Sequence, residues 1–207
     1  MTRKALLVLT ILALSLSSCV YSLFPIYTED TIVFKPELLG EWKLDDGQYQ
    51  LKFERYDEAK PKEKFNLDSR QGSYKKEDTE SSYKLTVDDL NDPNSKESFQ
   101  AHLVQIGDFL FLDLIPLNEY RNANLSNNYM ALHSFAKLSF NEKELVLTQF
   151  DLGKLNELFE SNLIRLRHES VNGTVMITAQ PKELQKFLER YAEDESVFEE
   201  SQLYQKQ

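Results

Sequence analysis

The chain has 207 residues, of which 41% are hydrophobic and one is cysteine, and its formal net charge is −10. These values predict one domain with a substantial core, and the single cysteine excludes an internal disulfide, a CxxC redox pair or a cysteine-based zinc cluster. The acidic balance also excludes nucleic acid as an expected partner, because a polyanion would be repelled and no Lys/Arg-rich patch offsets the repulsion.

The first predicted element is a signal peptide at residues 1–18. Arg3 and Lys4 form a positive head, and residues 5–16 form an apolar run that is too short to span a bilayer. An alternative is an uncleaved apolar N-terminus followed by an ordinary buried thiol. A lone cysteine placed directly after such a stretch favours the signal peptide.

The residues that close this stretch, Leu16-Ser17-Ser18-Cys19, resemble the lipobox of bacterial lipoproteins. The resemblance implies cleavage before Cys19, acylation of its thiol with diacylglycerol, and usually a third acyl chain on the freed amino group. Two or three chains anchor a protein stably, since each buried methylene contributes about 0.8 kcal/mol. Val20 stands where an aspartate would retain such a protein at the inner membrane, so the resemblance implies a lipid-anchored protein of the cell envelope at the outer membrane.

Without residues 1–18 the chain has 22 basic and 34 acidic side chains, a formal net charge of −12. Lipid, and not a polybasic surface, is therefore the expected membrane contact. Residues 19–33 are interpreted as a lipidated tether. Their uncharged aromatic composition after Cys19 favours some docking on the domain, because a free linker is richer in Gly, Ser and charge.

The predicted domain, residues 34–198, begins with a helical turn that Pro36 can open and Gly40 can end. The spacing Gly40-x-Trp42 after such a turn resembles the N-terminal signature of lipocalins. That resemblance implies that Trp42 plugs the closed end of a barrel and that an arginine of a late strand, Arg165 or Arg167, packs on its ring. Trp42 can line a ligand pocket or cap a filled core, and the core is the preferred interpretation.

Alternating apolar and polar residues predict strands with one solvent-exposed face at residues 49–54, 83–88 and 99–103. The non-alternating run 109–114 predicts the most buried strand, and residues 130–138 and 145–150 continue the series. The charged stretch 57–82 predicts one short edge strand between loops, and residues 116–128 predict a loop over one end of the sheet.

The last third of the chain adds two predicted helices. Asp151 can cap a helix at residues 151–162, and Pro181 opens a second one. Between them a hairpin is predicted from residues 163–169 and 174–179 across Asn172-Gly173. The tail, residues 199–207, is predicted to be flexible and to fray.

These elements predict a mainly β fold: an antiparallel, lipocalin-like or calycin-like barrel of about eight to nine strands with two short helices in the C-terminal half. The helix at 151–162 departs from a simple up-and-down barrel. The pattern of this helix, the hairpin and the run Pro181-Lys-Glu-Leu-Gln-Lys-Phe-Leu is similar to uncharacterised lipoproteins of Bacteroidota type. That resemblance implies a barrel and brings no catalytic residues.

The sequence offers little chemistry. His102, His133 and His168 each stand alone, without a metal-ligand partner, and no catalytic elbow, phosphate loop or HExxH helix is present. We therefore predict no enzyme activity, no cofactor and no metal. The first hypothesis is an envelope lipoprotein whose barrel binds a small hydrophobic ligand or lipid. The alternative is a filled barrel that serves as an interaction or assembly module. An envelope hydrolase is the third hypothesis and ranks last, because it would need a pocket in which titratable groups converge.

Overall fold

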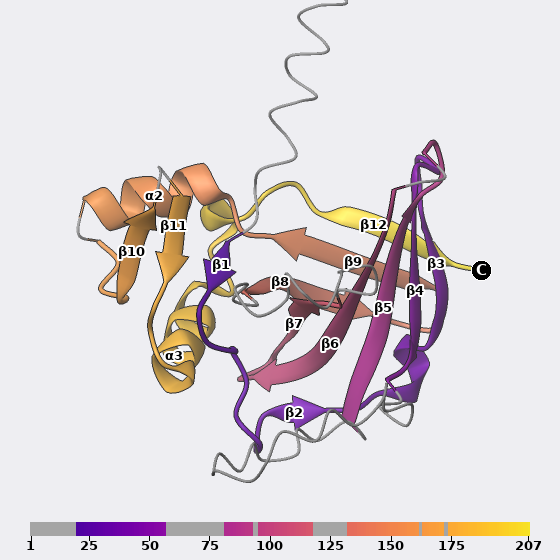
Figure 1. The fold of residues 1–207 in the computed structure, drawn as a ribbon, viewed down its shortest axis with the longest axis horizontal. Helices are drawn as coiled ribbons and strands as arrows, with labels where there is room; N and C mark the ends of the chain where they lie inside the picture. Colours follow the sequence, from indigo (N-terminus) through magenta and orange to yellow (C-terminus); the bar gives the residue numbers. More distant parts are fainter. Residues whose placement is uncertain (1–19, 57–80, 93–94, 118–131, 162, 172–173) are drawn as a thin grey trace, which may run out of the picture.

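The computed structural model describes residues 20–56, 81–92, 95–117, 132–161, 163–171 and 174–207 (Figure 1). Its elements, in chain order, are β1 (Tyr21–Ser22), β2 (Ile32–Val33), η1 (Pro36–Leu38), β3 (Gly40–Leu44), β4 (Tyr49–Arg55), β5 (Ser82–Asp89), β6 (Lys96–Ile106), β7 (Phe109–Pro116), β8 (His133–Phe140), β9 (Glu144–Gln149), α2 (Leu152–Glu160), β10 (His168–Val171), β11 (Thr174–Ile177), α3 (Pro181–Tyr191), η4 (Glu195–Val197) and β12 (Gln202–Lys206).

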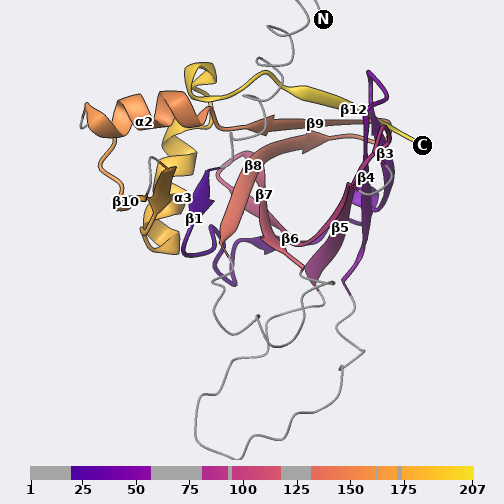
Figure 2. The same cartoon turned by 45° about the horizontal axis from the view of Figure 1, so that its top comes forward.

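Eight strands close into an antiparallel barrel (Figures 1 and 2). Strands β3 to β9 pair in chain order, each with the next. Strand β12 then lies between the two ends of this series and pairs with β9 and with β3. This arrangement confirms the predicted fold class, a mainly β protein with an antiparallel barrel and two helices in the C-terminal half.

Four of the strands predicted in the first half are present. Residues 49–54, 83–88, 99–103 and 109–114 fall within β4, β5, β6 and β7. Strand β6, and not β7, has the larger number of buried residues, because β5, β7 and β2 all pair with it. The predicted signal peptide and Cys19, residues 57–80 of the stretch 57–82 in which an edge strand is expected, and most of the loop at 116–128 lie outside the described residues.

The prediction that residues 199–207 form a flexible tail is wrong. These residues include β12, which has Tyr204 opposite Leu145 of β9 and opposite Leu44 of β3, and Tyr204 is 3% exposed. The acidic residues Glu199 and Glu200, which precede this strand, had suggested that the C-terminal residues are solvated. A strand of five residues is stabilised here by two neighbouring strands that are far away in sequence.

The predicted tether is also part of the fold. Residues 20–34, which we call the strap, cross the barrel and join it to the C-terminal elements. Strand β1 pairs with β8 in antiparallel fashion and with β11 in parallel fashion, and β2 pairs with β6. Val20 and Ile26 are 3% and 0% exposed. The folded domain therefore starts at residue 20 and not at residue 34.

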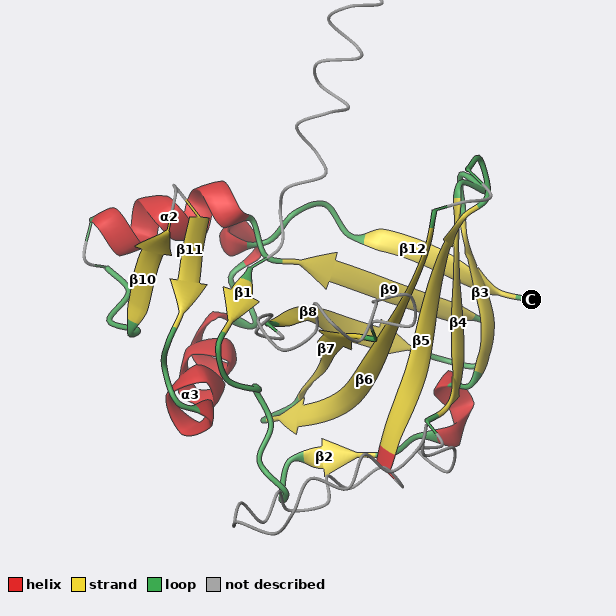
Figure 3. Ribbon diagram, viewed as in Figure 1, coloured by secondary structure: helices red, strands yellow, loops and turns green. Residues whose placement is uncertain are grey.

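The chain leaves the barrel after β9 and returns to it at β12, and the excursion explains the departure from an up-and-down barrel. It contains α2, the β10–β11 hairpin and α3, which lie together beside the barrel (Figure 3). Their apolar side chains form a second core with the strap and the outward-facing residues of β6, β7 and β8. The predicted hairpin is confirmed with shorter strands, and its turn, Asn172-Gly173, lies outside the described residues.

Candidate functional site

The interior of the barrel is filled by side chains. The inward-facing residues alternate along each strand, as expected for a barrel. The buried members are 0 to 3% exposed, and they are Leu38, Trp42, Leu51, Phe53, Tyr83, Leu85, Ala101, Leu103, Leu112, Leu138, Leu145 and Tyr204. An exposed fraction near zero means that a water-sized sphere reaches the side chain neither from solvent nor from an enclosed void. The middle of this barrel therefore has no room for a ligand among these residues.

Trp42 belongs to the barrel core, which supports the preferred core interpretation. Its side chain is completely buried, and Nε1 donates a hydrogen bond to the carbonyl of Leu38 at 2.9 Å. The Lys206 ammonium lies 4.8 Å from the centre of the indole and donates to the carbonyl of Glu37 at 2.7 Å. Gly40 has a φ of 122°, and a Cβ at this position would lie 3.3 Å from Cε of Lys206. The glycine thus lets Lys206 approach the ring.

The expected arginine partner of Trp42 is wrong. Arg165 and Arg167 are exposed and lie before β10, in the excursion outside the barrel. Arg167 pairs instead with Glu183 of α3, at 2.7 Å between Nη2 and Oε2. The strand beside β3 is β12, so the cation that reaches the ring comes from β12. Sequence reasoning missed it because residues 199–207 were not interpreted as a strand.

Replacing Lys206 by alanine is expected to lower the free energy of unfolding by about 1 kcal/mol, because a cation over an aromatic face contributes roughly 0.5 to 2 kcal/mol. The emission of Trp42, the sole tryptophan, should shift as well. Arg165→Ala is the control, with an expected change within about 0.5 kcal/mol for an exposed side chain. Urea titrations give both values, and an equal loss in the two variants would contradict the assignment of Lys206.

An aromatic stack connects the strap to the barrel. Phe34 stacks on Tyr83 with ring centres 4.7 Å apart, and the Arg55 guanidinium lies 4.2 Å from the centre of the Phe34 ring on the Phe34 side of the stack. The Tyr83 hydroxyl accepts from the backbone N–H of Lys35 at 2.7 Å and donates to the carbonyl of the same residue at 3.1 Å. Burial raises the pKa of Tyr83 from 10.0 to about 12.

Stability is expected to fall steeply above pH 10. Burial also raises the pKa of Tyr204 from 10.0 to about 12. Because the folded pKa values lie above those of the unfolded chain, the folded state keeps protons that the unfolded chain has lost, and stability decreases as pH rises from 10.0 to about 12. Melting curves across this range should show a shallower decline for Tyr83→Phe than for the parent. Parallel curves would refute the role of Tyr83.

A hollow of about 490 Å³ opens to solvent beside η1. Its apolar lining comes from Phe34, Pro36, Leu110 and Phe140, and its polar rim includes Lys35, Glu37, Asn141 and Glu142. The strap, β7 and the β8–β9 turn thus meet at this place. The apolar side of the hollow can contact a small apolar group.

The outer face of β3, β4, β5 and β6 contains a second, strongly polar hollow of about 370 Å³. We call it the charged groove, and its lining is Glu41, Gln50, Lys52, Glu54, Lys84, Thr86, Asp88, Lys96 and Ser98. Lys52 lies 3.7 Å from Glu41 and 3.2 Å from Glu54, and Lys96 lies 3.1 Å from Asp88. Such exposed pairs contribute about 0 to 1 kcal/mol each to stability, so a partner can rearrange them at little cost.

A buried hydrogen-bonded contact between Asp113 and His133 lies between the barrel and the strap. Asp113 of β7 is 0% exposed; its Oδ1 lies 2.7 Å from Nδ1 of His133, and its Oδ2 accepts from the backbone N–H of Ile26 at 2.9 Å. Tyr27 covers the pair and contacts the ring of His102 at 4.3 Å. The sequence indicated isolated strand histidines and did not show this pairing, because Asp113 and His133 lie on different strands.

Within the described residues, no group of three His, Cys, Asp or Glu side chains is arranged to hold a metal ion. Among the same residues, no helix is long and apolar enough to cross a membrane. The Asp113–His133 pair contacts the strap through the hydrogen bond that Asp113 accepts from the Ile26 N–H.

Comparisons of this chain with protein-family models, with curated proteins and with solved structures find no match, so its function is argued from its own geometry.

Proposed function

We propose that the protein is a non-enzymatic lipoprotein of the bacterial cell envelope whose filled barrel binds another envelope protein. The observation that supports this proposal is the barrel interior, where twelve inward-facing side chains are only 0 to 3% exposed. A filled interior leaves the outer faces to carry the function. The lipid on Cys19 holds the domain at the membrane, and the outer membrane is the proposed location.

The charged groove is the proposed partner surface. It combines three lysines with Glu41, Glu54 and Asp88 on one side of the barrel. Mixed charges of this kind favour recognition of a complementary protein surface, because complementary charge steers association and penalises wrong partners. A polyanion or an anionic bilayer would meet both signs of charge here and gain little.

Crosslinking in intact cells tests this function. A photoreactive residue in place of Ser98 is expected to yield one specific protein adduct, and the double reversal Lys52→Glu and Lys96→Glu is expected to abolish it. The matched control is a photoreactive residue in place of Glu169, which is exposed on β10 outside the barrel. Adducts of lipid alone, or the same protein at both positions, would count against the proposal.

The anchor is tested separately. Mass spectrometry of the protein isolated from membranes should show a chain that begins at Cys19 and carries fatty acyl groups, and Cys19→Ser should remain unprocessed. A mature protein with an intact first methionine and a bare thiol would exclude a lipoprotein.

A second candidate function is the binding of a small hydrophobic ligand, favoured by the hollow beside η1. Its apolar lining of Phe34, Pro36, Leu110 and Phe140 can hold one end of an acyl chain or a ring. Organic extracts of the purified protein, analysed by mass spectrometry, should then contain a retained molecule that Leu110→Trp removes. Repeated extracts without such a molecule would leave the interaction module as the function.

A further inference from the structure

Partly exposed apolar side chains collect at the end of the barrel that lies opposite η1. Because neighbouring strands are antiparallel, β3, β5, β7 and β9 finish at this end, and β4, β6, β8 and β12 begin there. The inward-facing apolar side chains near this end pack on the barrel core and are only partly buried, and they are Leu44, Tyr49, Val87, Phe99, Leu114 and Leu147. Together with Leu90, which is 42% exposed, we call them the barrel mouth.

The residues of the barrel mouth are neighbours across the strands. Phe99 of β6 and Tyr49 of β4 are the diagonal neighbours of Val87 on the inner face of β5. Such neighbours are about 7 to 8 Å apart, within reach of aromatic side chains. The N–H of Leu90 donates to the carbonyl of Gln48 at 2.8 Å, so the β5–β6 connection lies beside the β3–β4 turn, at the upper right of Figure 1. Neighbouring exposed apolar side chains mark an interaction site when polar residues surround them.

Carboxylates surround this apolar patch. On the inner faces of β5 and β6, the position beyond the last apolar residue is Asp89 and Glu97, respectively, and the β3–β4 turn adds Asp45 and Asp46. We call these four residues the acidic lip. Burial raises the pKa of Tyr204, and the negative charge of Asp46 raises it further. The charge of the lip therefore acts on the interior of the barrel.

The lysines at this end belong to the outer faces of the strands. Lys96 pairs with Asp88 at 3.1 Å, and Cε of Lys43 lies 3.5 Å from the position that a Cβ of Gly47 would take. Among the described residues at this end, no inward-facing position holds a lysine or an arginine. The inner side of the acidic lip is therefore negative.

These features restrict what can bind at the barrel mouth. Complementary charge steers association and penalises wrong partners, so an occupant that combines apolar surface with positive charge is favoured over an anionic one. A small apolar ligand has no enclosed space here, because the core side chains beneath the mouth are 0 to 3% exposed. A protein segment fits better, since an apolar side chain can rest on the mouth while flanking lysines or arginines reach the lip.

We propose that the barrel mouth binds a basic amphipathic segment of a partner protein, with apolar side chains on the mouth and lysine or arginine on the acidic lip. This inference goes beyond the proposed function. It does not depend on a lipid anchor, and the surface shares no residue with the charged groove.

Photocrosslinking of a defined peptide tests the proposal. The probe is a synthetic amphipathic peptide of leucine and lysine that carries one photoreactive leucine analogue, and it is mixed with the full chain. Mass spectrometry is expected to find adducts at the residues of the barrel mouth. The same peptide with glutamate in place of lysine should bind several-fold more weakly in fluorescence anisotropy. Adducts mainly elsewhere on the chain, or equal binding of the two peptides, would overturn the proposal.

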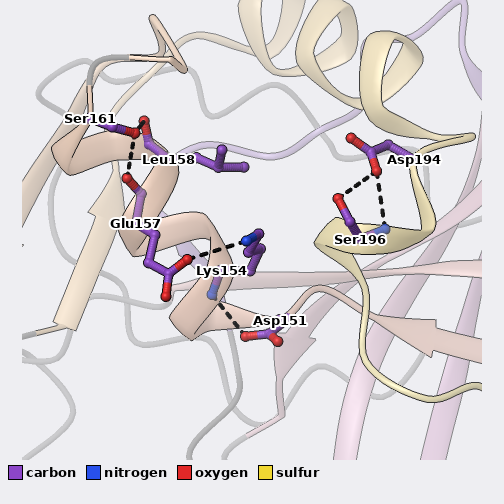
Figure 4. A network of polar contacts seen from close by, with 7 residues as sticks. All are labelled: Asp151, Lys154, Glu157, Leu158, Ser161, Asp194 and Ser196. Carbon is purple, nitrogen blue, oxygen red and sulfur yellow. Dashed lines mark hydrogen bonds and ion pairs between the residues drawn. The ribbon is translucent and has the colours of Figure 1, made fainter.

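Two double variants of equal net charge test the acidic lip. Asp89→Asn with Glu97→Gln is expected to weaken binding of the lysine peptide several-fold, because two opposite charges beside the apolar patch are lost. The control, Glu157→Gln with Glu160→Gln, removes two carboxylates from α2, where Glu157 lies 3.3 Å from Lys154 (Figure 4). Equal weakening by both double variants would mean attraction by net charge alone and would overturn the site.

Two exposed leucines test the apolar part. Leu90→Lys places a like charge in the barrel mouth and is expected to weaken binding of the lysine peptide several-fold. The control is Leu163→Lys, in the excursion outside the barrel, where the side chain is 66% exposed. Circular dichroism checks that both variants are folded. If Leu90→Lys bound the lysine peptide as well as Leu163→Lys does, the barrel mouth would not be the binding site.

Discussion

Removal of residues 202–207 is expected to prevent the chain from folding. The deletion takes away β12, which lies between β9 and β3, and leaves both as unpaired edges. It also removes the buried ring of Tyr204 and the cation over Trp42. Burial of one large apolar side chain contributes about 1.5 to 3 kcal/mol and each ladder hydrogen bond about 0.5 to 1.5 kcal/mol, so the summed loss is comparable to the 5 to 15 kcal/mol that stabilises a typical domain.

Circular dichroism and thermal melting of the truncated chain provide the measurement, with aggregation as the expected visible result. The control is a chain that lacks only Gln207, whose backbone N–H donates to the carbonyl of Glu41 at 2.9 Å. This control should melt within a few degrees of the parent. If the chain without residues 202–207 also melted cooperatively near the parent temperature, β12 would not be an integral barrel strand.

The second large effect is expected for Asp113→Ala. The substitution leaves His133 and the N–H of Ile26 without their buried partner. Leaving a buried hydrogen-bonding group without its partner costs about 1 to 3 kcal/mol, and both His133 and the Ile26 N–H lose theirs here. The strap should loosen with it, because the Ile26 N–H donates to the same carboxylate. Asp113→Asn keeps the shape and one acceptor oxygen and should lose less.

The matched control is Asp88→Ala, an aspartate of a barrel strand whose partly exposed side chain pairs with Lys96. Its expected cost is about 0 to 1 kcal/mol. Urea unfolding of the three variants gives the free energies, and hydrogen exchange at Ile26 reports on the strap. Equal losses for Asp113→Ala and Asp88→Ala, or an unchanged exchange rate at Ile26, would show that the pair does not hold the strap.

Local patterns predicted the barrel strands well because each of them buries one face. Alternation located β4, β5 and β6, and Asp151 marked the beginning of α2, where its side chain accepts from the N–H of Lys154 at 2.9 Å. The same reasoning failed for β1, β2 and β12, which have two, two and five residues. Two residues are too few to show an alternation, so β1 and β2 could not be distinguished from a loop. Strand β12 was missed because the acidic pair Glu199-Glu200 before it suggested a solvated end.

The candidate site was predictable only in part. Trp42 and Gly40 were identified from their spacing, and in the structure Trp42 is completely buried in the barrel core and Gly40 has a φ of 122°. Their cationic partner, Lys206, was missed, because it lies 164 positions from Trp42 in the sequence and belongs to a strand that no local pattern indicates.

The sequence by itself determined a mainly β protein of one domain, with alternating strands, two helices and a lone cysteine behind an apolar N-terminal stretch. The tertiary structure alone decided that the barrel is closed by the last strand, that the strap is part of the fold, and that the interior is filled. The physical reason is that alternation records which face of a strand avoids water. It does not record which distant strand supplies the missing hydrogen bonds, or whether the side chains that meet inside a barrel leave a void.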